Sequence, residues 1–100
     1  MKGLAAVLLS LSAAGCVGGI PEPDARMAGG DGELLAQLRE GRRLYVDRCS
    51  GCHALFPVDR YSDEAWVAEV EEMTRLNKVR LKPSEKERLL LYLRAANGPE

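Results

Sequence analysis

The chain has 100 residues, of which 46% are hydrophobic and 29% are charged, and this length leaves room for one globular domain. Its 14 basic and 15 acidic side chains nearly balance, which argues against a nucleic-acid-binding protein, because such proteins usually carry a basic excess on one face. A domain this small commonly depends on a metal, a disulfide or a large buried cofactor for its stability. We therefore expect something besides side chains to fill part of the core.

The first 15 residues are typical of an export signal. Met1 and Lys2 give a positive start, and residues 4–14 form an apolar run that has signal-peptide length and is too short to span a bilayer. Small residues then precede Cys16, a pattern that resembles the lipobox at which bacterial lipoproteins are cleaved and acylated. We predict that residues 1–15 are removed and that Cys16 carries a lipid, which places the protein in the bacterial periplasm, anchored to the inner or outer membrane. Plain secretory cleavage nearby, an uncleaved membrane anchor and a buried N-terminal helix are the alternatives.

The rest of the chain divides into a linker and a helical domain. Residues 16–32 are rich in glycine and proline and show no apolar period, which predicts a flexible tether. The domain is expected over residues 33–97. Its fold class is predicted to be all-α, with helices over residues 33–48, 62–75 and 84–96 and no strand.

A stripe of apolar side chains follows one face of the first predicted helix: Leu34, Leu35, Leu38, Leu44 and Tyr45. This spacing is typical of a helix that packs on a core. Gly41 lies within the same helix, where a glycine lowers helix stability. We therefore expect another group to need the space that a side chain at position 41 would fill.

The second and third predicted helices carry their own start signals. Ser62 can cap the second helix by accepting hydrogen bonds from its first backbone N–H groups. Three side chains then share one face of that helix: Trp66, Val70 and Met73. Ser84 and Glu87 form a candidate capping box at the start of the third helix, and Gly98 marks its end.

The strongest motif is Cys49-Ser50-Gly51-Cys52-His53, which directly follows the first predicted helix. Two thiols at this spacing can add to the two vinyl groups of haem, and the adjacent histidine can ligate the iron. A redox disulfide or half a zinc site also uses two cysteines at this spacing, but no second ligand pair follows in the chain. The motif therefore predicts one covalent haem c held by Cys49 and Cys52, with His53, the only histidine, as its proximal iron ligand.

The domain resembles the class I c-type cytochromes. Gly41 and Tyr45 lie eight and four residues before Cys49, at the positions where that family keeps a glycine and an aromatic residue. The run Leu89-Leu90-Leu91-Tyr92-Leu93-Arg94 is similar to the C-terminal helix of the family, which crosses the N-terminal helix at that glycine while the aromatic residues pack together. The resemblance covers about residues 31–97 and implies a cytochrome c fold with three main helices around one haem.

The distal iron ligand is predicted to be Met73, the only methionine after the haem motif. A His/Met pair raises the reduction potential and suits an electron carrier. The spacing of Trp66, Val70 and Met73 also resembles that of some small bacterial monohaem cytochromes. Other candidates stay open, together with an open sixth site: Asn77, Lys78, Lys82 and Met27.

The expected function is one-electron transfer, with no substrate turned over and hence no enzyme activity. The expected partners are a redox protein donor and acceptor, including a membrane oxidoreductase, and no nucleic acid or small-molecule substrate. The alternative is a haem c ligand-binding or sensor protein whose sixth site is open or weakly held. A basic cluster either is an ordinary solvated surface or steers an acidic partner toward the haem: Arg75, Lys78, Arg80 and Lys82.

Overall fold

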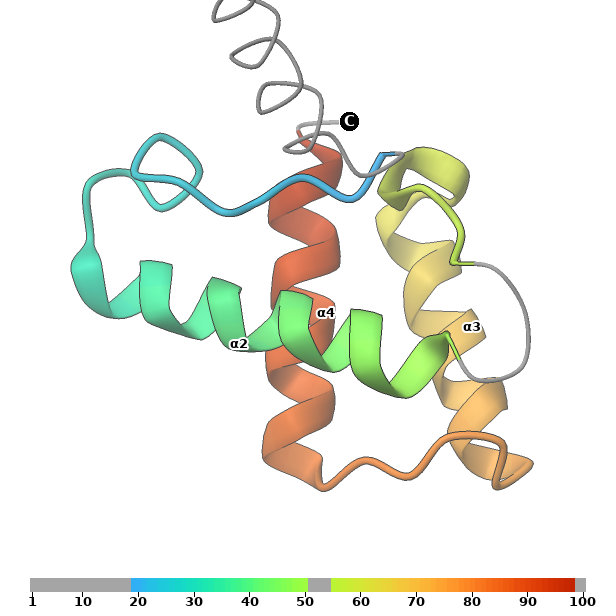
Figure 1. Ribbon diagram of the computed structural model, residues 1–100. Coiled ribbons are helices and arrows are strands. Elements are labelled where there is room, and N and C mark those ends of the chain that lie inside the picture. The colour runs from blue at the N-terminus through green and yellow to red at the C-terminus, as the bar shows by residue number, and fades with distance from the viewer. Residues whose placement is uncertain (1–18, 51–54, 99–100) are drawn as a thin grey trace, which may run out of the picture.

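The computed structural model describes residues 19–50 and 55–98 of the chain. In these residues the chain forms three α-helices and one short 3-10 helix, with no strand (Figure 1). They are α2 (Gly32–Cys49), η1 (Val58–Arg60), α3 (Asp63–Arg75) and α4 (Pro83–Asn97). The all-α prediction is confirmed, and each predicted helix boundary agrees within one residue. None of the helices in the described residues is both long and apolar enough to cross a membrane.

Helix α2 begins where Asp31 caps it. The Asp31 carboxylate accepts hydrogen bonds from the backbone N–H groups of Glu33 and Leu34, at 2.9 and 3.1 Å, which satisfies donors that have no partner inside the helix. Leu38 and Leu44 are fully buried on the apolar face of the helix. The predicted stripe therefore does face the core.

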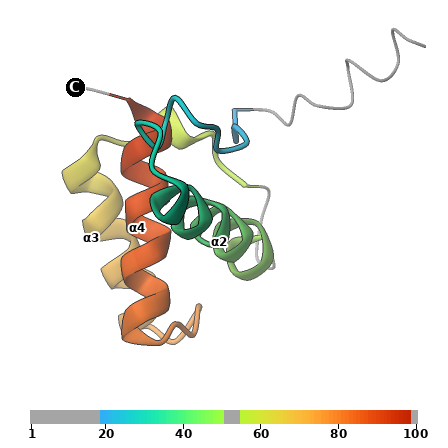
Figure 2. The same cartoon turned by 90° about the vertical axis from the view of Figure 1, so that its left-hand side faces the viewer.

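Helices α2 and α4 cross at Gly41. A Cβ atom added to Gly41 would overlap the backbone carbonyl oxygen of Arg88 and would lie 2.7 Å from the Cβ atom of Tyr92. Figures 1 and 2 show α2 lying across the middle of α4. The expectation that a neighbouring group needs the space at Gly41 is confirmed, and this group is the backbone of α4.

The start of α4 differs from the predicted capping box of Ser84 and Glu87. The helix begins at Pro83, and the Glu85 carboxylate accepts a hydrogen bond of 2.9 Å from the backbone N–H of Lys82. Proline is well suited to the first helical position, because its φ angle is already helical and the missing N–H would have had no partner there. Pro83 therefore moves the helix start, and with it the capping carboxylate, toward the N-terminus.

Residues 19–31 also differ from expectation, because this part of the predicted flexible tether packs on the domain. Ile20 and Ala28 are buried, at 4% and 3% exposure, and belong to the same core cluster as the helices. The hydroxyl of Tyr92 on α4 donates a hydrogen bond of 2.7 Å to the carbonyl of Pro21. A segment without helical or strand periodicity can thus still bury single apolar side chains.

Candidate functional site

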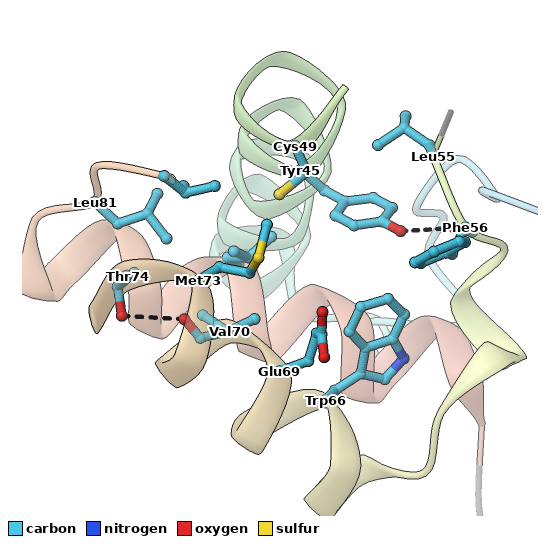
Figure 3. Close-up of a pocket in the computed structure, with 12 residues that line it drawn as sticks. Tyr45, Cys49, Leu55, Phe56, Trp66, Glu69, Val70, Met73, Thr74 and Leu81 are labelled. Carbon is cyan, nitrogen blue, oxygen red and sulfur yellow. Dashed lines mark hydrogen bonds between the residues drawn. The ribbon is translucent and has the colours of Figure 1, made fainter. Parts of the chain in front are cut away.

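A hollow opens between the C-terminal half of α2, the length of α3 and the loops on either side of α3 (Figure 3). The empty space in it amounts to about 480 Å³ when the part open to solvent is included. Eight of the lining side chains are apolar: Leu55, Phe56, Trp66, Val70, Met73, Val79, Leu81 and Leu89. The hollow therefore suits a flat or bulky apolar group rather than a small polar one.

Helix α3 supplies one wall. Ser62 caps it by accepting a hydrogen bond of 3.2 Å from the N–H of Ala65, as predicted. The indole N–H of Trp66 donates a hydrogen bond of 2.7 Å to the carbonyl of Val58. This bond satisfies the one polar atom of a side chain that is only 4% exposed and fixes the plane of the ring. Trp66, Val70 and Met73 line the hollow together, which confirms the shared face.

Tyr45, on α2, contacts residues on two sides of the hollow: Trp66 on α3 and Phe56 in the segment before η1. Its ring meets the Trp66 ring edge to face, with the ring centroids 5.7 Å apart, a geometry that aromatic pairs favour. Its hydroxyl donates a hydrogen bond of 2.6 Å to the carbonyl of Phe56. Burial, the largest influence, raises the pKa of the Tyr45 hydroxyl well above its ordinary value. The phenol therefore stays protonated and keeps the end of α2 close to the segment that begins at Leu55.

Cys49 and Met73 approach the hollow from different helices. Cys49 is the last residue of α2, and Met73 lies on the last turn of α3. Both side chains line the hollow, and Figure 3 shows both sulfur atoms directed into it. Cys52 and His53, the other predicted haem-binding residues, lie outside the described residues. The predicted lipidation site at Cys16 also lies outside them.

The other candidate distal ligands lie elsewhere. The described lining of the hollow includes Met73 but not Asn77, Lys78, Lys82 or Met27. Asn77 adopts a left-handed conformation, with φ of 59°, just after the end of α3, and Lys82 borders a separate depression beside Arg48. Met27 packs on the core from the N-terminal segment. Met73 is thus the candidate that the fold brings to the hollow.

Glu69 lines the hollow but is not among the site residues predicted from the sequence. Its side chain is half-buried and makes no hydrogen bond or ion pair with any described residue. Figure 3 shows its carboxylate between Trp66 and Met73, directed into the hollow. Residues 66, 69, 70 and 73 follow the i, i+3, i+4, i+7 spacing of one helix face. That spacing could have identified Glu69, but a charged side chain is normally assigned to the solvent side.

The basic cluster lies where α3 leads into α4, and all four of its side chains are exposed. Arg75 forms an ion pair of 2.9 Å with Glu72. Arg48, at the end of α2, donates a hydrogen bond of 2.7 Å to the carbonyl of Arg80 and pairs with Glu85 at 3.0 Å. The end of α2 is therefore connected to the loop that carries the cluster. Whether the cluster steers a partner stays a prediction.

Among the described residues, no three His, Cys, Asp or Glu side chains gather into a metal-binding group. Comparisons of the chain with protein-family models, with curated proteins and with solved structures find no match.

Proposed function

We propose that the chain is a small monohaem c-type cytochrome that carries one electron at a time. Cys49 and Cys52 would hold the haem covalently, His53 would be its proximal iron ligand and Met73 its distal ligand. The three helices would then form a cytochrome c fold around the group. The chemistry that the haem supplies is one-electron exchange between ferrous and ferric iron.

The placement of Cys49 and Met73 carries this proposal. The sequence motif puts Cys49 first in a haem-attachment signal, and the fold puts Met73 on a facing helix across the same hollow. The apolar lining of the hollow fits the ring of a haem, and Cys49 beside it would supply one of the two thiols that attach the group. Two independent observations, one from motif spacing and one from packing, thus point to the same group.

The chain's own residues would fix the surroundings of the iron. Trp66 and Tyr45 are held in place by hydrogen bonds to backbone carbonyls, so the wall behind the haem would be rigid. The apolar side chains around the hollow would keep water away from a bound haem, and the polarity of the surroundings is one of the factors that set the potential of a metal site. Glu69 would place a carboxyl group in this largely apolar wall.

Optical spectroscopy of the Met73→Ala variant tests the proposal. The parent should show a weak ferric absorption near the red end of the visible spectrum and no response to carbon monoxide, because a firmly bound thioether blocks the sixth site. Met73→Ala should abolish that absorption and admit carbon monoxide. Met27→Ala is the matched control, because Met27 does not line the hollow, and it should leave both properties unchanged.

A different outcome would support the alternative function. A parent protein that binds carbon monoxide readily, with a spectrum unchanged by Met73→Ala, would have an open or weakly held sixth site. That result would favour a haem c ligand-binding or sensor protein over an electron carrier.

The proposal also includes a location and partners. The protein would be exported, cleaved before Cys16, acylated on that residue and held at a bacterial membrane facing the periplasm. Its partners would be a redox donor and a redox acceptor. Mass spectrometry of protein extracted from membranes tests the anchor: a mass without an acyl group on Cys16 would rule it out.

A further inference from the structure

The N-terminal segment, residues 19–24, is fastened to the domain at several points. The carbonyl of Gly19 accepts a hydrogen bond of 2.9 Å from the N–H of Val58 in η1. The Arg42 guanidinium donates to the carbonyl of Ile20, at 3.1 Å from its terminal nitrogen, and pairs with Glu22 at 3.2 Å. Together with the bond from Tyr92 to Pro21, these contacts attach the segment to η1, α2 and α4.

The chain stays ordered from this segment to the first helix. Ile20, Pro23 and Ala28 are buried. The Asp24 carboxylate accepts a hydrogen bond of 2.9 Å from the N–H of Met27, and backbone hydrogen bonds then connect the turn to Asp31, the cap of α2. The described chain between Gly19 and α2 is therefore a packed extension of the domain, with no free linker in it.

This packing shortens the connection between Cys16 and the domain. A flexible chain from residue 16 to residue 32 would have a root-mean-square reach of roughly 20–24 Å. Only three Cα–Cα steps separate Cys16 from Gly19, which limits that span to about 11 Å. Gly19 is itself held against η1, since a Cβ atom there would lie 2.6 Å from that of Pro57.

The point of attachment lies at one end of the molecule. Asn97, the last residue of α4, donates a hydrogen bond of 2.9 Å to the carbonyl of Tyr61, just after η1. The basic cluster lies at the other end of α4, since Lys82 directly precedes Pro83. The 15 residues of α4 separate the two ends by about 22 Å. Figure 1 shows residues 19–24 and η1 at the C-terminal end of α4, with the loop before α4 opposite them.

We propose that residues 19–24 and η1, here called the anchor end, form the membrane-facing surface of the protein and that the basic cluster faces away from the bilayer. This inference rests on the proposed lipid anchor at Cys16. The domain would be held close to the lipid headgroups in a defined orientation, so a redox partner would reach the basic cluster from the aqueous side. Diffusion of the domain on a long tether would play no part.

The charges at the two ends make this proposal distinguishable from simple electrostatic attraction. The anchor end exposes three acidic side chains, Glu22, Asp24 and Asp59, and one basic side chain, Arg60, so it carries an acidic excess, whereas an anionic bilayer attracts basic side chains by about 1 kcal/mol each. A domain on a free tether would therefore turn its basic cluster toward an anionic bilayer. The packed segment predicts the opposite orientation.

Labelling with a bulky amine reagent tests the orientation. The acylated, haem-loaded Asp59→Lys variant would be bound to vesicles of phosphatidylethanolamine and phosphatidylglycerol, and modification would be measured at position 59 and at Lys78 of the same molecules. We expect labelling at position 59 to fall several-fold relative to Lys78 on vesicles, compared with the same protein in detergent. A long Gly-Ser insertion between Gly18 and Gly19 should abolish this protection.

The outcomes separate the orientation from the anchor. An acylated, vesicle-bound protein with equal labelling at the two positions, or with Lys78 as strongly protected as position 59, would overturn the orientation and leave the anchor intact. A protein without an acyl group that fails to bind vesicles would overturn both. Selective protection of position 59 that disappears with the insertion is the result that supports the proposal.

Discussion

The core of this protein has two halves that are built differently. Where α2 crosses α4, the protein fills its own interior, and three side chains of the shared core there are completely buried: Leu38, Tyr92 and Leu93. Where α2 ends beside α3, apolar side chains of the same kind surround an open hollow, and Leu55, Met73 and Leu81 stay half-exposed around it. The interior at the crossing is filled by protein atoms, whereas the hollow is a space that protein atoms do not fill.

The difference shows how a chain this small can combine a stable scaffold with a site. Close packing requires that two surfaces fit together. Gly41 makes this possible at the crossing, because without a side chain it lets the α4 backbone approach α2. The hollow has apolar walls without matched surfaces, and exposed apolar surface of this kind is unfavourable in water. We therefore expect the crossing to determine folding and the hollow to determine cofactor binding, and the following changes test that division.

The largest effect is expected for the double variant Cys49→Ala, Cys52→Ala. Removal of both thiols should abolish covalent haem attachment completely, because no thioether bond can form. Acid extraction followed by measurement of the haem left on the protein checks this. Ser50→Ala, which changes the residue after Cys49, is the control and should retain the haem. Haem that resists extraction from the double variant would contradict the attachment assignment.

Leu93→Ala and Leu81→Ala compare the two halves directly. Leu93 is fully buried at the crossing, so its truncation should lower the free energy of unfolding by about 2–5 kcal/mol. Leu81 lines the hollow and is half-exposed, so its truncation should cost about 1 kcal/mol but should make the sixth site more accessible to carbon monoxide. Urea denaturation and carbon monoxide titration of both variants measure these effects. Equal losses of stability would remove the distinction between the halves.

Gly41→Ala tests the crossing alone. An added methyl group would collide with the Arg88 carbonyl, a backbone atom that cannot rotate away, so we expect a loss of about 1–3 kcal/mol, although alanine favours the helix. Gly32→Ala is the matched control in the same helix, because its Cβ atom would meet nothing within 4 Å. That variant should be neutral or slightly stabilising. Thermal denaturation distinguishes the two, and equal melting temperatures would contradict the packing argument.

The smallest effect concerns Tyr92 and pH. Burial, offset in part by Arg42, raises the pKa of Tyr92 to about 12, above the value of about 10 for an exposed tyrosine. The folded state therefore keeps this proton longer than the unfolded state, so stability is retained below about pH 10 and declines as pH rises toward 12. Tyr92→Phe should weaken that decline and, by losing the bond to Pro21, cost about 1 kcal/mol near neutral pH.

Urea denaturation across this pH range measures both effects. Tyr61→Phe is the control, because no described hydrogen bond involves the Tyr61 hydroxyl. An alkaline decline that is identical in the parent and in Tyr92→Phe would show that Tyr92 does not contribute to it. Burial also raises the pKa of Tyr45, so Tyr45 should contribute to the same loss of stability at high pH. Part of the decline should therefore persist in the Tyr92→Phe variant.

The sequence by itself determined the local features of the fold. Ser62 caps α3 as predicted, because its side chain bonds to a backbone group three residues away. The three helices follow from apolar periodicity, and Gly41 is recognisable as a candidate contact point because glycine is unfavourable within a helix unless a close approach requires it. These features depend on neighbouring residues, so the order of residues along the chain contains the necessary information.

Only the tertiary structure decided which distant residues meet. It placed Met73 rather than Lys82 at the hollow, directed Glu69 toward the hollow rather than solvent, and folded residues 19–31 back onto α2 and α4. Residues 19–31 have no periodicity, so their burial depends on single contacts such as Tyr92 with Pro21, 71 positions apart. Contacts of that kind are set by the shape of the surface on which a segment lies, and that surface exists only after the helices have packed.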